Sequence, residues 1–139
     1  MKLIQSSVQV QTRPKSFANI TAQMQNVVSE SKIQCGLAHL FLRHTSASLI
    51  VQENADPDVL ADLERFFSRL VPENAHYTHS AEGPDDMPGH IRTVLTQTSL
   101  SVPVRQGRLV LGTWQAIYLW EHRAHGSTRE VLVTVQGEE

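Results

Sequence analysis

The stretch SLSVPVRQGRLVLGTWQAIYLWEHRAHGSTREVLVTV, residues 99–135, decides the fold class of this chain. Four segments of it are rich in β-branched and aromatic residues, which favours strands. The turn sequences Gln106-Gly107 and AHGST separate some of these segments. The predicted strands are SLSVPV, RLVLGTWQ, AIYLWEHR and EVLVTV. A run of strands that follows helical segments predicts an α+β fold with a largely antiparallel sheet or sandwich.

Upstream of this stretch, strands and helices are mixed. Residues 3–11, 37–45 and 48–53 have the composition of strands. Apolar side chains at helical spacing predict a helix over residues 17–29, with Ser16 as its N-cap.

Two more helices are expected in the middle of the chain. Asp56 and Pro57 form a helix start, and Leu60, Leu63, Phe67 and Leu70 follow on one face. Residues 72–87 have no periodicity and predict a long loop, which in a compact domain usually builds or covers a site. Pro88 can begin a short helix in which Ile91, Val94 and Leu95 face inward.

The chain therefore predicts one domain over residues 1–139, with antiparallel, β-sandwich-like sheets, two main helices and one short helix. A chain of 139 residues is long enough for one core. No internal repeat or linker divides it.

Composition argues against several partners. The net charge is −2 and the nine arginines and three lysines are dispersed, so no basic stripe for nucleic acid is expected. No apolar run approaches the length of a membrane span, and the N-terminal residues lack the apolar core of a signal peptide. Cys35 is the only cysteine, which excludes an intramolecular disulfide and fits a reducing compartment. We expect a cytoplasmic protein without nucleic-acid or membrane partners.

The segment EGPDDMPGHIR, residues 82–92, concentrates ionisable groups where the loop meets the short helix. Its ligand-type side chains, with one from the preceding loop, are His79, Glu82, Asp85, Asp86 and His90. Two imidazoles and a carboxylate are a common zinc set, and carboxylates also suit magnesium. The spacing matches no standard metal motif, and the alternative is that the carboxylates stabilise the helix start.

His44 ends an apolar strand and precedes three small hydroxyl residues, Thr45, Ser46 and Ser48. These hydroxyls can donate to anionic oxygens, and His44 can act as acid, base or ligand near neutral pH. The alternative is a histidine at a strand end with satisfied nitrogens. A serine-hydrolase site is disfavoured because no GxSxG elbow is present.

Near the end of AIYLWEHR, alternation along a regular strand places Glu121 and His122 on opposite sides. At most one of them is then expected in a given pocket. Trp114 and Trp120 are interpreted as core or interface residues.

Four motifs in this order, HTSAS, ENADPDV, EGPDDMPGHIR and GTWQAIYLWEHR, closely resemble the YjbQ-like family, and the resemblance covers nearly the whole chain. Members of that family are described as secondary thiamine-phosphate synthases. The resemblance implies a β-sandwich with two main helices, assembled as a homotrimer around packed sheets. It also implies a weak transferase activity that joins hydroxymethylpyrimidine diphosphate to thiazole phosphate.

The resemblance also points to site residues. We expect catalytic roles for His44, Asp86 and His90. The expected substrate-binding residues are Thr45, Ser46, Asn54, Asp85 and Gln115, and the expected metal ligands are His79, Glu121 and His122. Family members commonly have alanine where this chain has Gly89, and glycine where it has Ala116.

A diphosphate leaving group needs a cation or preorganised donors, whereas residues 82–92 are acidic. We therefore expect a divalent ion, zinc or magnesium, between Asp85, Asp86 or the histidines and a phosphorylated small-molecule substrate, with His44 or His90 carrying the proton. The alternatives are a metal-dependent hydrolase of a small phosphorylated metabolite and a non-catalytic trimeric anion-binding module.

Overall fold

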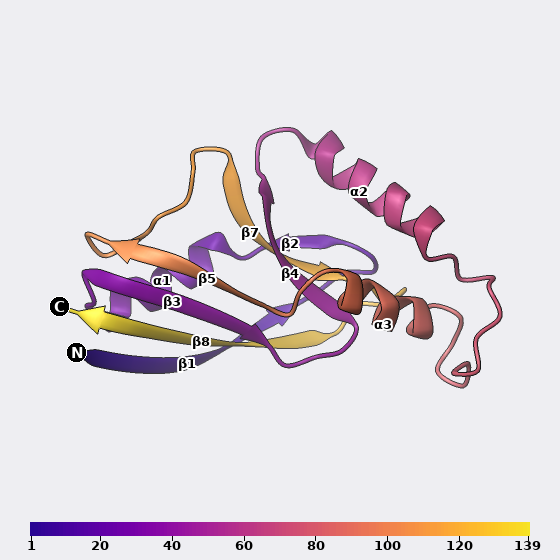
Figure 1. Ribbon diagram of the computed structural model, residues 1–139, viewed down its shortest axis with the longest axis horizontal. Helices are drawn as coiled ribbons and strands as arrows, with labels where there is room; N and C mark the ends of the chain where they lie inside the picture. The colour runs from indigo at the N-terminus through magenta and orange to yellow at the C-terminus, as the bar shows by residue number, and fades with distance from the viewer.

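The computed structural model describes residues 1–139 as two antiparallel sheets and three helices (Figure 1). The five-stranded sheet has the order β1 (Lys2–Gln11), β8 (Thr128–Glu138), β3 (Cys35–Leu42), β5 (Ser99–Arg105) and β6 (Arg108–Leu109). The three-stranded sheet has the order β2 (Phe17–Asn19), β7 (Gln115–Glu121) and β4 (Ala47–Glu53). The helices are α1 (Thr21–Ser31), α2 (Pro57–Leu70) and α3 (Asp86–Leu95). The α+β class predicted from the sequence is confirmed.

The core lies between the two sheets and α1. Strand alternation buries Val131, Val133 and Val135 of β8, which pack with Leu49 and Leu119 of the smaller sheet. One cluster of 18 buried apolar residues joins these elements. The two ends of the chain lie side by side, because β1 and β8 pair along their whole length (Figure 1).

The predicted helix over residues 17–29 begins too early. Phe17 belongs to β2 and pairs with Trp120 of β7, and the helix starts only at Thr21. The side chain of Asn19 accepts hydrogen bonds from the backbone N–H and the hydroxyl of Thr21. Phe17 also stacks on Trp120, with ring centroids 4.6 Å apart. Pairing with β7 thus overrides the helical pattern of the first residues.

The predicted strand over residues 108–115 is also corrected. Only Arg108 and Leu109 pair in β6. The N–H of Gly112 donates to the side chain of Gln115 instead, in a turn that leaves Trp114 64 % exposed. Trp120, by contrast, is buried.

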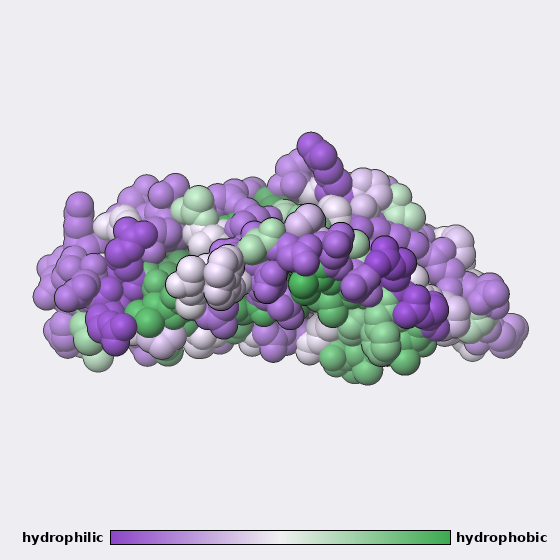
Figure 2. Space-filling model, turned by 90° about the horizontal axis from the view of Figure 1, so that it is seen from above, coloured by the Kyte–Doolittle hydropathy of each residue, from purple (hydrophilic) through white to green (hydrophobic).

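The helix over residues 57–70 is confirmed, with Asp56 accepting a hydrogen bond from the N–H of Asp58 as its cap. None of its residues is fully buried, since α2 lies outside the sheets (Figure 1). Figure 2 shows apolar side chains on the surface at the end of the molecule that carries α2 and α3. Phe66 and Leu70 of α2 are about half exposed.

Helix α3 begins at Asp86, two residues before the predicted start. Val94 is 83 % exposed and Leu95 is 54 % exposed, so the expectation that both face inward is wrong. Pro88, Gly89 and Arg92 are the residues of α3 that lie against the protein, together with Asp86. None of the three helices is long and apolar enough to cross a membrane.

Candidate metal centre

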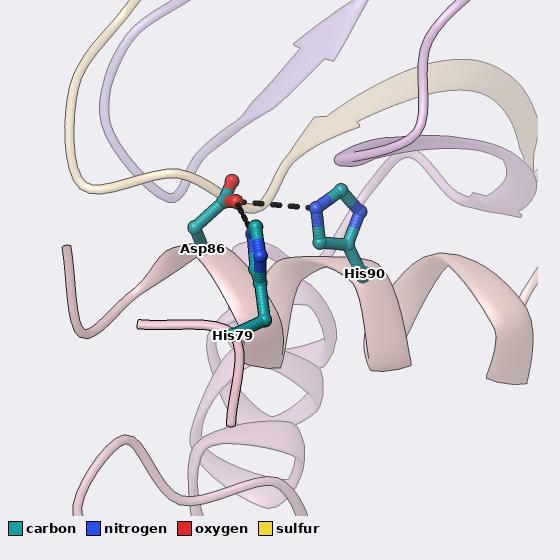
Figure 3. A group of neighbouring side chains, drawn as sticks. All are labelled: His79, Asp86 and His90. Carbon is teal, nitrogen blue, oxygen red and sulfur yellow. Dashed lines mark hydrogen bonds and ion pairs between the residues drawn. The ribbon is translucent and has the colours of Figure 1, made fainter. Parts of the chain in front are cut away.

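The structure brings together three of the predicted ligand residues, His79, Asp86 and His90 (Figure 3). Their ligand atoms all lie within 4.8 Å of one another. Asp86 opens α3, His90 follows one turn later, and the loop after α2 carries His79 back over that turn. Oδ2 of Asp86 lies 2.7 Å from Nε2 of His79 and 3.2 Å from Nε2 of His90. The carboxylate of Asp86 is buried, whereas the side chain of His79 is 46 % exposed, so the centre lies at the surface.

A backbone carbonyl fixes the tautomer of His90. Nδ1 of His90 lies 2.9 Å from the carbonyl oxygen of Thr45, which can only accept, so Nδ1 carries the hydrogen. If the ring is neutral, Nε2 carries a lone pair, and this lone pair faces Oδ2 of Asp86, which is also an acceptor. Two acceptors 3.2 Å apart attract each other only with a proton or a metal ion between them. This donor set fits a divalent metal, and the Thr45 carbonyl is the outer partner that orients a metal-binding histidine.

Arg123 holds the carboxylates on the side away from the histidines. Its Nη1 lies 2.9 Å from Oδ1 of Asp86, and its Nε donates to Oδ2 of Asp85 at 2.8 Å. The third nitrogen, Nη2, donates to the carbonyl of Glu82. All three guanidinium nitrogens of Arg123 are therefore engaged by the loop and the first residue of α3, and Oδ2 of Asp86 is left for the histidines.

These contacts keep both aspartates ionised. Burial alone would raise the pKa of Asp85, but hydrogen bonds from Arg123 and from the N–H of Ala124 lower it to about 2. Burial also opposes ionisation of Asp86, yet the hydrogen bond with His79 and the charge of Arg123 hold its pKa below the ordinary value. Asp85 is the N-cap residue of α3, but its side chain makes no cap hydrogen bond to the helix. Its carboxylate accepts a hydrogen bond from Arg123 instead.

A buried ion pair supports the segment from His44 to Ser48. Nη2 of Arg129 donates to Oγ of Ser46 at 2.9 Å and pairs with Glu121 at 2.5 Å. Glu121 also accepts from the hydroxyl of Thr12. Burial would raise the pKa of Glu121, but these hydrogen bonds lower it. The predicted metal ligand Glu121 is thus a buried partner of Arg129, away from the three-residue centre.

His44 does not join the centre either. Its Nε2 accepts a hydrogen bond from the backbone N–H of Glu130 at 2.8 Å, and Nδ1 faces Arg129 at 3.4 Å. Burial and the charge of Arg129 lower the pKa of His44. Of the two neighbours in the same motif, Thr45 contributes its carbonyl to His90, while the hydroxyl of Ser46 is engaged by Arg129.

His122 is buried on the other side of β7 from Glu121, as the strand alternation predicted. Its Nε2 contacts Oγ of Ser48 at 2.7 Å and its ring packs against Trp120. Burial and the charge of Arg92 lower its pKa to about 3, so the ring is neutral at physiological pH. It is not among the clustered ligands.

Asn54 and Gln115 lie at the opposite end of β7. Gln115 is paired with Glu53, and Asn54 donates to the carbonyl of Thr113. Gln115 and Glu121 are the two ends of β7, six steps or about 20 Å apart along the strand. The structure therefore does not bring this predicted substrate-binding pair to the metal centre.

Sequence reasoning missed Arg123 and Arg129, which organise the carboxylates and the 44–48 segment. Arg123 follows EH in the last motif, but an arginine after a strand end carries no signal of its own. Only the register of β7 against β4, which places Glu121 opposite Ala47, reveals that these segments meet.

The sequence profile of the family described as UPF0047 protein YjbQ-like matches residues 6–138. The chain belongs to this family. A UPF0047 protein of Synechocystis is 56% identical over 130 residues, which is 93% of this chain and 88% of the relative. The UPF0047 protein YjbQ of Salmonella typhimurium is 50% identical over 135 residues, covering 96% of this chain and 98% of the relative.

Solved structures of the YjbQ-like family have the same fold. A YbjQ-like protein of unknown function from Sulfolobus solfataricus superposes with a TM-score of 0.90 at 25% identity, over 99% of both chains. An uncharacterized conserved protein of the same family from Clostridium acetobutylicum gives 0.87 at 32% identity, over 94% of this chain and 99% of that one. The resemblance seen in the four motifs is thereby confirmed at the level of family and fold.

Proposed function

We propose that this YjbQ-like protein is a metal-dependent enzyme that acts on a small phosphorylated substrate with a diphosphate leaving group. Thiamine-phosphate synthesis, the activity implied by the family resemblance, is the named reaction. The observation that carries the proposal is the convergence of His79, Asp86 and His90, in which Nε2 of both histidines faces Oδ2 of Asp86, at 2.7 and 3.2 Å.

Two imidazole nitrogens and one carboxylate oxygen are three of the four ligands of a catalytic zinc site, which keeps one position open. His79 and His90 would bind through Nε2, and Asp86 through Oδ2. A bound divalent cation would supply charge neutralisation and Lewis acidity to a diphosphate. No free guanidinium replaces it here, because every nitrogen of Arg123 is already held by Asp85, Asp86 and the Glu82 carbonyl.

The protein groups around the centre have separate tasks. Arg123 fixes both aspartates in place and offsets their charge. The Thr45 carbonyl orients the ring of His90. His79 is the exposed member, with Nδ1 free of protein partners, so it lies where substrate arrives. A proton-carrying role for His44 stays a prediction, since its Nε2 is occupied by the Glu130 N–H.

The same donor set favours a second candidate, a metal-dependent hydrolase of a phosphorylated metabolite. Two histidines and one carboxylate are the ligands of several zinc hydrolases. In that case thiamine-phosphate synthesis would be incidental. A non-catalytic trimeric anion-binding module is the remaining alternative, and turnover separates it from both enzymes.

The test uses tag-free protein treated with chelator and then supplied with zinc or magnesium. Diphosphate release is measured with hydroxymethylpyrimidine diphosphate alone and together with thiazole phosphate. We expect release that requires metal and both substrates. Release from the diphosphate alone would favour the hydrolase, and binding without release would favour the module.

Two variants assign the activity to the centre. Asp86→Asn keeps the side-chain shape but removes the ligand charge, and we expect at least a tenfold loss. Asp62→Asn, at an exposed carboxylate on α2, is the matched control. Full activity in a folded Asp86→Asn protein would refute the proposal.

A further inference from the structure

A cleft lies at the edge of the smaller sheet, where β4 runs next to α2 and α3 (Figure 1). Its volume is about 330 Å³, which is within the usual range of small-molecule sites. Apolar side chains from β4, β7, α2 and the end of α3 form most of its wall: Ile50, Trp120, Leu63, Phe67 and Leu95. None of the three residues of the metal centre lines this cleft.

The register of β4 shows which of its main-chain groups point away from β7. The Ser46 carbonyl accepts from the N–H of His122, and the N–H of Asn54 donates to the carbonyl of Trp114. In an antiparallel pair, the main-chain groups of successive residues alternate between the two sides of a strand. Even-numbered residues from 46 to 54 therefore bond to β7, and the odd-numbered residues between them point to the outer edge.

Val51 is the residue of this outer edge whose N–H and C=O both lack a partner. The N–H of Leu49 donates to the carbonyl of Gln97 at 3.0 Å. The N–H of Glu53 donates to the side chain of Gln52 at 2.9 Å. One unpaired donor and one unpaired acceptor thus stand between two occupied positions.

The main chain of Val51 faces the cleft. Its side chain packs against the core between the sheets, whereas the neighbouring Ile50 points to the other face, where Phe67 packs against Trp120. Val51 still lines the cleft, so it does so with its main-chain edge. Residues 95–97 lie along that edge and also line the cleft, because Gln97 is the partner of the Leu49 N–H.

The lining favours a neutral ligand. The polar members of the wall are uncharged, namely Gln52, Thr96 and Gln97. A charged ligand would leave water without gaining a counter-charge. A peptide added as a further strand needs free main-chain groups at alternate residues, and here the N–H groups of Leu49 and Glu53 are already taken. A flat ring needs only the pair on Val51.

We propose that this cleft binds a small, neutral, planar cyclic amide whose C=O accepts from the N–H of Val51 and whose N–H donates to the C=O of Val51. These two bonds hold one edge of the ring, and the apolar wall contacts the rest. A cavity of about 150 Å³ holds one benzene ring, so a cleft of about 330 Å³ has room for one or two fused rings. The site does not depend on the function proposed for the metal centre.

α-Pyridone is a suitable probe, because its N–H and C=O are adjacent in a neutral, planar ring. N-Methyl-α-pyridone is the matched control, since a methyl group replaces the N–H in the same ring. The experiment uses chelator-treated, ¹⁵N-labelled protein and follows the amide of Val51 and the indole N–H of Trp120 by NMR. We expect α-pyridone to shift the Val51 amide saturably, and the N-methyl compound to bind at least about fivefold more weakly.

Two substitutions at one position separate the main chain from the side chain. Val51→Pro removes the N–H, and an outward N–H on an edge strand is a place where proline breaks no ladder hydrogen bond. This variant should lose the saturable binding of α-pyridone, which the indole signal of Trp120 reports. Val51→Ala shortens the same side chain but keeps the N–H, and should bind α-pyridone as the wild-type protein does.

The wild-type spectra decide the question even if Val51→Pro does not fold. A Val51 amide that does not shift with α-pyridone up to millimolar concentrations, or that shifts equally with the N-methyl compound, would overturn the proposal. So would a Val51 amide that, in the free protein, is as strongly protected from hydrogen exchange as the paired amide of Leu49.

Discussion

The carbonyl oxygen of Thr45 lies 2.9 Å from Nδ1 of His90. This contact joins the segment after β3 to the first turns of α3, which are 45 residues apart in the chain. The Thr45 carbonyl holds the hydrogen of His90 on Nδ1, and the ring then presents Nε2 to Asp86. In this orientation Nε2 can bind a cation together with Asp86.

The first prediction concerns that nitrogen. Titration of ¹⁵N-histidine-labelled protein with zinc should shift the Nε2 signals of His79 and His90, while Nδ1 of His90 keeps its hydrogen. The reason is that the Thr45 carbonyl can only accept from Nδ1. Loss of the Nδ1 hydrogen of His90 on zinc binding would show that the ring turns over and that the observed contact is not retained.

Gly89 provides a test of how closely α3 packs against Ser46 and His122. A Cβ at this position would lie 3.5 Å from Cβ of Ser46 and 3.6 Å from Cβ of His122, which is ordinary van der Waals contact. Gly89→Ala should therefore raise the free energy of unfolding by about 0.5–1 kcal/mol, because alanine favours the helix.

Urea denaturation measures the difference. Gly107→Ala is the contrasting control, since Gly107 has a φ of 73° and a side chain there is strained. Destabilisation by Gly89→Ala would mean that α3 packs more tightly on the 46–48 segment than the structure indicates.

Acid should weaken the fold well above the pKa values of the carboxylates. Burial lowers the pKa of His122 to about 3 from an ordinary 6.5. Between these values the unfolded chain binds a proton that the folded chain does not, so stability falls as pH falls from 6.5. One such proton gives a slope of about 1.4 kcal/mol per pH unit, and the lowered pKa of His44 adds to it.

Urea denaturation at several values between about pH 7 and pH 4 measures this slope. His122→Asn should reduce it by about one proton, whereas His125→Asn should leave it unchanged. An identical slope in wild-type and His122→Asn proteins would exclude His122 as the source.

The outer face of the five-stranded sheet offers a surface for the expected homotrimer. No helix covers this face, on which Leu3, Leu37 and Phe41 lie among polar side chains, and Leu3 and Phe41 are about half exposed. Phe41→Glu should convert a trimer into monomers, because it places three charges at the contact. Phe66→Glu, on α2, is the comparison.

Sedimentation velocity distinguishes the cases. We expect a trimer for the wild-type protein and for Phe66→Glu. A stable wild-type monomer of 15.6 kDa at micromolar concentration would contradict the assembly.

The elements with local signals were predicted well from the sequence. Asp56 and Pro57 mark the start of α2, and the valines of β8 alternate as a half-buried strand must. Phe17 was misplaced because its partner, Trp120, lies about a hundred residues away and draws it into β2. The missed exposure of Val94 has a related cause: helical periodicity identifies an apolar face but not which protein surface covers it.

The candidate site was predicted in part for the same reason. His79, Asp86 and His90 stand close in sequence, so their clustering follows from one loop and one helical turn. Glu121 lies outside this group because it pairs with Arg129 from another strand, and Gln115 lies outside it because the length of β7 separates it from the centre. Cross-strand register decides these positions, and ligand-type residues alone do not encode it.

The metal centre itself is tested most directly by elemental analysis of tag-free protein purified without chelator. The account predicts close to one zinc or other divalent transition-metal ion per chain in the wild-type protein, with loss of the metal in His79→Ala, Asp86→Asn and His90→Ala. His44→Ala and His122→Ala should keep it. A folded wild-type protein that contains no such metal and takes up none when zinc is added would contradict the account, as would a site lost with His122 but not with His90.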